Sequence, residues 1–209
     1  MRKTTSILIM AMALSAPAFA ADSVENHSFD AKGLTRLRLE HPVGDLTIRG
    51  ADGNTVEVHM TVDCSGRGCD DKVGNIRFRS STKSGELQLE VDGYPRFRGN
   101  VNVNLDIRVP KSLAVSIDHG VGETEIVGLL NDIDVDAGVG EVEIRSSAKA
   151  FRSAKLDAGV GEAELEVSGE TIGGGSFLFV GGEREWKGGQ GKARLDLEVG
   201  VGSATVTLD

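Results

Sequence analysis

Residues 133–144 read Ile-Asp-Val-Asp-Ala-Gly-Val-Gly-Glu-Val-Glu-Ile and contain the pattern that decides the fold. Apolar side chains alternate with carboxylates on both sides of a Gly-Val-Gly centre. Period-two alternation is typical of a β-strand with one buried face, and glycine permits a tight turn between two such strands. The stretch therefore predicts a strand, a glycine turn and a second, shorter strand.

The Gly-Val-Gly centre recurs through the second half of the chain. Its second glycine falls at Gly122, Gly140, Gly161 and Gly202, and Gly182 fits the same frame. The successive spacings are 18, 21, 21 and 20 residues, and an earlier copy centred on Gly44 lies 78 residues before Gly122. Self-similarity at a fixed period predicts stacked repeats, each burying its apolar face against its neighbours. An antiparallel sandwich with recurring turns is the alternative.

Aligned on this glycine, the copies share apolar columns that we expect in the core. The columns seven and five residues before the glycine and four residues after it are almost entirely apolar. The valine directly before the glycine forms a further column that we also expect to fill the core: Val43, Val121, Val139, Val160 and Val201.

The sequence thus predicts an all-β protein, built as a β-solenoid of stacked strand repeats of about 20 residues. We expect residues 21–209 to form a single domain, with less regular strands over 21–110 and regular repeats over 111–209. Apolar residues alternate at 56–62, 87–91 and 101–109, and Pro110 ends the last of these runs, as a proline should.

Residues 1–20 have the pattern of a signal peptide. Arg2 and Lys3 precede an apolar run from Ile7 to Leu14, and Ala18-Phe19-Ala20 matches a cleavage site. The apolar run is too short to span a bilayer. We therefore expect export of a soluble protein to a periplasm or to the extracellular space.

The chain is acidic, with a formal net charge of −9. The charge is concentrated in residues 111–209, where 18 Asp or Glu face 9 Lys or Arg. Such a balance disfavours binding to nucleic acid or to anionic membranes.

Cys64 and Cys69 are the two cysteines of the chain. An exported protein meets an oxidising compartment, so we expect them to form a disulfide. A Cys-x4-Cys metal site is the alternative, but the loop lacks the further ligands that zinc needs.

The chain resembles a known family. The run Val-Gly-Asp-Leu-Thr-Ile-Arg-Gly at 43–50, Ile-Arg-Val-Pro at 107–110 and the later Gly-x-Gly-Glu-x-x-Ile repeats are similar to the bacterial putative-adhesin β-strand-repeat family, which is related to the head-GIN adhesins. The resemblance implies a solenoid-like fold and an envelope setting, and it supplies no catalytic residues.

Carboxylates flank each glycine turn and would form acidic ladders in a stack. We take the following as candidate cation ligands: Asp118, Glu123, Asp136, Glu141, Asp157 and Glu162. Like charges about 5 Å apart repel by about 0.8 kcal/mol in bulk water, and either Ca²⁺ or solvent and salt could relieve this. His41 and His119 share one column, where a core role competes with a metal or proton role.

The sequence predicts a non-enzymatic envelope protein of adhesin type, with an envelope protein or a glycan as partner and no assigned ligand-binding residue or cofactor. A Ca²⁺-stabilised structural module is the second hypothesis, and an enzyme acting on envelope polysaccharide is the third. Because residues 206–209 end inside a repeat, we also expect self-association through the open ends of the stack.

Overall fold

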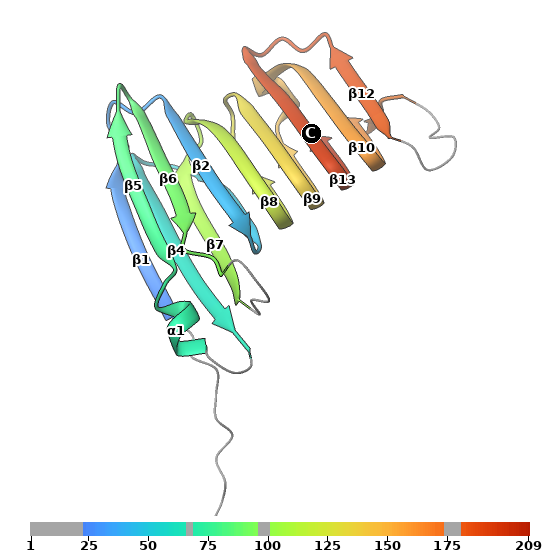
Figure 1. Cartoon of the computed structure of the whole chain (residues 1–209). Helices are drawn as coiled ribbons and strands as arrows, with labels where there is room; N and C mark the ends of the chain where they lie inside the picture. Colours follow the sequence, from blue (N-terminus) through green and yellow to red (C-terminus); the bar gives the residue numbers. More distant parts are fainter. Residues whose placement is uncertain (1–22, 66–68, 96–100, 174–180) are drawn as a thin grey trace, which may run out of the picture.

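The computed structural model of the protein describes residues 23–65, 69–95, 101–173 and 181–209 (Figure 1). The predicted signal peptide lies outside these ranges. The all-β prediction is confirmed, because the described residues form a mixed sheet of 13 strands that is interrupted by one short α-helix and one 3-10 turn.

The first half of the chain contributes seven of these strands. They are β1 (Ser23–Asp30), β2 (Arg36–Val43), β3 (Leu46–Ala51), β4 (Thr55–Cys64), β5 (Arg77–Lys83), β6 (Glu86–Asp92) and β7 (Val101–Pro110), with helix α1 (Cys69–Val73) between β4 and β5. The alternating runs predicted at 56–62, 87–91 and 101–109 coincide with β4, β6 and β7, and β7 ends at Pro110 as expected.

The second half contributes the long strands that carry the Gly-Val-Gly repeats. They are β8 (Ala114–Val127), β9 (Ile133–Ser146), β10 (Phe151–Val167) and β13 (Ala193–Leu208), with the 3-10 turn η1 (Ala148–Ala150) before β10 and the short strands β11 (Glu170–Thr171) and β12 (Gly182–Lys187) after it.

The long strands bend at their central glycine, so that each contributes to two layers. Gly140, for example, has φ +149°, and a Cβ on it would lie 1.9 Å from the carbonyl oxygen of Gly122 on the neighbouring strand. Before the bend, β8 pairs with β2, which pairs with β6 and through it with β5. After the bend, β8 pairs with β3, which leads to β7, β4 and β1.

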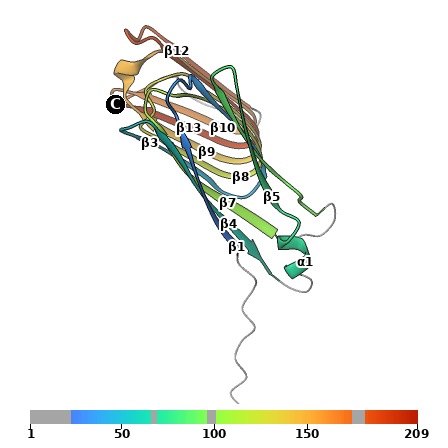
Figure 2. The same ribbon diagram turned by 90° about the vertical axis from the view of Figure 1, so that its left-hand side faces the viewer.

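One core fills the space between the two layers (Figures 1 and 2). The columns expected seven and five residues before the glycine, and four residues after it, are buried in all the long strands. Beyond the bent strands, where β1 faces β5, the ring of His27 stacks on Phe78 at 4.3 Å between centroids and covers the edge of the core.

The valine column is where the prediction of the core is wrong. Val121, Val139, Val160 and Val201 are 47–52 % exposed. The prediction assumed that alternation continues through the turn. The bend instead shifts its phase, so that the buried side chains are those three residues before the glycine and two residues after it, such as Ala137 and Val142 around Gly140.

The order of the stacked strands also differs from a sequentially wound solenoid, which is therefore not confirmed. Strand β13 lies between β9 and β10 and pairs in parallel with both. The copy centred on Gly182 is not a parallel repeat, because β12 runs antiparallel along β10. Residues 206–208, expected at an open end of the stack, are thus paired on both sides.

The predicted disulfide between Cys64 and Cys69 is present, with their Cα atoms 5.6 Å apart. It joins the end of β4 to the start of α1. Both cysteines are buried in the core cluster, so the bond fixes the helix against the sheet.

Candidate functional site

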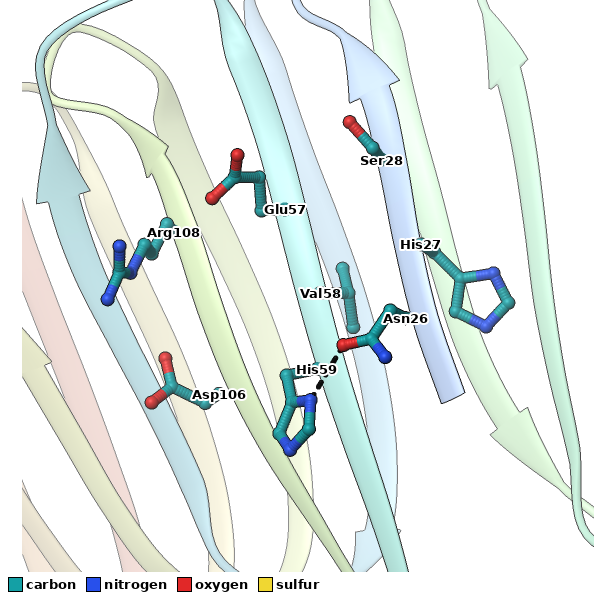
Figure 3. Close-up of a pocket in the computed structure, with 8 residues that line it drawn as sticks. All are labelled: Asn26, His27, Ser28, Glu57, Val58, His59, Asp106 and Arg108. Carbon is teal, nitrogen blue, oxygen red and sulfur yellow. Dashed lines mark hydrogen bonds between the residues drawn. The ribbon is translucent and has the colours of Figure 1, made fainter. Parts of the chain in front are cut away.

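An open hollow of about 460 Å³ lies on the outer face of β1, β4 and β7 (Figure 3). Strand register arranges six of its polar side chains in two rows. Asn26, His59 and Asp106 occupy neighbouring positions in one row. Ser28, Glu57 and Arg108 occupy the next. Because alternate residues of a strand share one face, all six side chains point to the same outer surface.

Hydrogen bonds hold part of this grid in place. His59 Nδ1 lies 2.7 Å from Asn26 Oδ1 and donates to it, which leaves Nε2 free for a ligand. Asp106 accepts from Arg49 of β3 at 2.9 Å. Among the described residues, neither Glu57 nor Arg108 takes part in an ion pair. The hollow therefore offers a free carboxylate, a free guanidinium and an imidazole on a rigid three-strand base.

A second hollow, of about 380 Å³, lies where β3, β8 and β9 run side by side beyond the bend, and it is acidic. Arg49 and Arg145 both pair with Glu125, at 3.2 and 3.4 Å, and Arg145 also pairs with Glu143. The other carboxylates of its lining have no ion pair with a described residue: Asp45, Glu123 and Glu141. We call this site the acidic hollow.

The predicted cation ligands are divided between the two layers. Glu123 and Glu141 are register neighbours in the acidic hollow, but Ser203 separates Glu141 from Glu162. In the other layer, Glu198 lies between Asp136 and Asp157. The full row across that layer is Glu90, Glu40, Asp118, Asp136, Glu198, Asp157 and Glu183.

The described residues contain no group of three or more His, Cys, Asp or Glu side chains placed to hold a metal ion. The acidic rows are thus linear arrays along the sheet. A Ca²⁺ site on them remains a hypothesis that the geometry does not itself support.

His41 and His119 come together inside the bend between β2 and β8. Their rings stack with centroids 5.0 Å apart, and both are almost completely buried. His119 Nε2 donates to the Gly44 carbonyl at 2.8 Å, and its Nδ1 accepts from the Thr124 hydroxyl at 2.7 Å. Neither nitrogen of His41 has a hydrogen-bond partner among the described residues.

This burial makes both histidines poor bases. Burial and the neighbouring His119 lower the pKa of His41 to about 3, against a weaker opposing effect of the backbone at Val103 and Gly44. Burial also lowers the pKa of His119, although the Gly44 carbonyl, Asp45 and Asp118 act in the opposite direction. The pair is therefore neutral at pH 7 and belongs to the core. This is the core role that the sequence analysis weighed against a metal or proton role.

The loop that follows β6 makes one further contact. The Tyr94 hydroxyl donates to the Val43 carbonyl at 2.8 Å, and burial raises its pKa. This side chain therefore anchors the loop to the strand bend. The Arg96-Phe97-Arg98 segment that follows lies outside the described residues.

The sequence indicated the acidic rows, but it gave no sign of the hollow in Figure 3. The six side chains of its two rows come from three strands that are distant along the chain, and each appears in the sequence as an ordinary strand residue. Only the pairing of β1 with β4 and of β4 with β7 brings them together.

Fold and surfaces together define an all-β protein with open polar faces rather than a closed cleft. The family described as the N-terminal domain of toast_rack, DUF2154, matches residues 20–166, and the chain belongs to this family. A comparison with curated proteins gives no match. No helix among the described residues is long and apolar enough to cross a membrane.

One solved structure shows the same kind of fold. A putative cell adhesion protein from Clostridium sporogenes aligns with a TM-score of 0.53 and 17 % identity over 90 % of this chain and 100 % of its own. A putative adhesin from Bacteroides fragilis aligns with a TM-score of 0.38 and 15 % identity over 88 % of this chain and 97 % of its own. At 17 % identity the similarity to the first of these structures concerns the fold alone, and the TM-score of the second supports no conclusion.

Proposed function

We propose that the protein is an exported, non-enzymatic binding module of adhesin type, and that it binds an envelope glycan through the hollow on β1, β4 and β7. The observation that carries this proposal is the two-row grid of Asn26, His59, Asp106, Ser28, Glu57 and Arg108 (Figure 3). Export and a kinship with head-GIN adhesins are part of the same proposal, which the signal-like residues 1–20 and the sequence resemblance support.

The chemistry of the grid suits a polyhydroxylated ligand. Sugar hydroxyls both donate and accept, and here Arg108 donates, whereas Glu57, Asp106 and His59 Nε2 accept, because the proton of the His59 ring is on the Nδ1 that donates to Asn26. Arg49 and Asn26 already hold Asp106 and His59 in position. A preorganised surface loses less side-chain freedom when a ligand binds.

A glycan array tests this proposal directly. We expect the wild-type protein to bind a set of envelope-type glycans, and Arg108→Ala and Glu57→Gln each to weaken that binding. Arg152→Ala is the matched control, because Arg152 is exposed on β10, away from the hollow. An array without any hit, or hits that both hollow variants retain, would refute the site.

Turnover separates a binding module from an enzyme. Each bound glycan is incubated with the protein and analysed for cleavage by mass spectrometry. We expect the glycan to remain intact. Cleavage that disappears in Glu57→Gln would instead establish the polysaccharide-active alternative.

A further inference from the structure

A row of valines runs across the stack along the outside of the bend. In spatial order it contains Val43, Val121, Val139, Val201 and Val160, each the register partner of the next. We call this row the valine ridge. Four of the six exposed large hydrophobic side chains among the described residues belong to it, so exposed apolar surface is concentrated at this one place.

The fold does not account for the apolar character of the ridge. The bend depends on the glycines on either side, and the inward positions at this level are filled by His41, His119 and Ala137. Extended backbone favours a β-branched side chain, but threonine satisfies that preference as well as valine does. An exposed apolar row that packing does not require is typical of an interaction surface.

Carboxylates border the ridge on both sides. Glycines, which have no side chain, flank four of the five valines, and Pro42 precedes Val43, so the nearest charged side chains are those beyond them. One border is the acidic row containing Asp118, Asp136, Glu198 and Asp157. The other is the acidic hollow, where Glu123 and Glu141 have no ion pair with a described residue.

These borders determine which partners fit. A second copy of the chain would bring two sets of carboxylates together, and an anionic membrane would be repelled in the same way. A partner with apolar side chains flanked by Lys or Arg would bury the valines and pair its cations with both borders. Such charge complementarity raises association rates and selects among partners.

We propose that the valine ridge is a docking surface for a basic amphipathic helix of a partner protein. Neighbouring strands are about 4.8 Å apart, so five valines span about 19 Å, the length of about 13 helical residues. The apolar stripe of a helix advances by about 5.4 Å per turn, close to the strand spacing. The ridge and the hollow of Figure 3 are different surfaces, so the two proposals succeed or fail separately.

The binding probe is a synthetic peptide of about 14 residues with repeated Leu-Lys-Lys-Leu-Leu-Lys-Leu, labelled for fluorescence anisotropy. The ridge variant is Val121→Thr with Val139→Thr and Val201→Thr, which keeps β-branched shape and removes apolar surface. We expect it to weaken peptide binding about tenfold or more while the thermal midpoint stays the same. Val24→Thr, at a valine that is 55 % exposed on β1, is the matched control and should bind like wild type.

A second variant, Asp136→Asn with Glu198→Gln, tests the role of the bordering carboxylates. We expect weaker binding and a smaller loss of affinity when salt is added, since fewer ion pairs remain to be screened. A peptide with glutamate in place of lysine should not bind. Unchanged affinity in the ridge variant, or equal loss in Val24→Thr, would overturn the proposal. Self-association of the wild-type protein that the ridge variant abolishes would overturn it as well, by making a second copy the occupant.

Discussion

Acidification should destabilise the protein through His41. A group whose pKa is lower in the folded than in the unfolded state binds more protons when unfolded, so stability falls as the pH falls between the two values. The pKa of His41 is lowered from 6.5 to about 3 by burial and by His119. The destabilisation should therefore begin below pH 6.5 and grow until about pH 3. The lowered pKa of His119 acts in the same direction.

The magnitude follows from linkage. Each pKa unit corresponds to about 1.4 kcal/mol. The effect of His41 alone should therefore lower the free energy of unfolding by about 2 kcal/mol as the pH falls from 7 to 5. The charged groups near the pair, Asp45 and Asp118, act on His119 against its downward shift. These two carboxylates reduce the loss of stability that His119 causes on acidification, but they do not turn it into a gain.

Urea unfolding at pH 7, 6 and 5 measures the effect in the wild-type protein and in His41→Leu. We expect the variant to lose about 2 kcal/mol less than wild type over this range, because no imidazole remains at that position to be charged. Val24→Leu is the control, since Val24 is 55 % exposed on β1 and the substitution changes no titratable group, so it should leave the pH dependence unchanged. A His41→Leu variant with the same pH dependence as wild type would refute the reasoning. An NMR titration in which the His41 ring protonates near pH 6.5 in the folded protein would refute it too.

Three further predictions follow from the glycines, the acidic row and the disulfide. Gly140→Ala should destabilise strongly, because its Cβ would lie 1.9 Å from the Gly122 carbonyl oxygen. Gly53 also has a positive φ, but a Cβ there would meet no atom within 4 Å, so Gly53→Ala should cost only about 1–3 kcal/mol of backbone strain. Similar losses for the two variants in urea melts would contradict this. Asp136→Asn should raise the urea midpoint, since each neighbouring carboxylate repels Asp136 by about 0.9 kcal/mol in bulk water before screening. This gain in stability should shrink when NaCl is added. A Ca²⁺ effect on stability beyond that of NaCl at equal ionic strength would favour the cation-binding hypothesis. Replacing Cys64 and Cys69 together by serine should cost about 2 kcal/mol, and an unchanged thermal midpoint under reducing conditions would show that the bond contributes nothing.

Local alternation was enough to predict the strands and most of the core. Leu39, Ile117, Val135 and Leu156 are buried as expected, because a period of two determines the inward face wherever the backbone stays extended. The same rule misplaced Val139, since it has no information about a bend that shifts the phase. A corner residue between two glycines is exposed for a reason that hydrophobicity alone does not reveal.

Strand order and the binding surfaces depend on pairings that the repeats do not encode. Strands β10 and β13 carry nearly the same pattern around Gly161 and Gly202, so either could follow β9 in the stack. The stacking of His41 on His119 needs the pairing of β2 with β8, about four repeat lengths apart, and only their shared column hinted at it. The hollow of Figure 3 could not be predicted from the sequence, because none of its residues belongs to a repeat.

The position of β13 between β9 and β10 also imposes an order in time. Ribosomes make residues 193–208 after both flanking strands, so one edge of β9 and one edge of β10 lack their native partner until this later segment emerges. A nascent chain stalled before residue 193 should therefore leave two long strand edges unpaired, which makes it prone to aggregation. A chain that completes its sheet so late during synthesis remains unfolded for longer, and the export proposed above would require such a state.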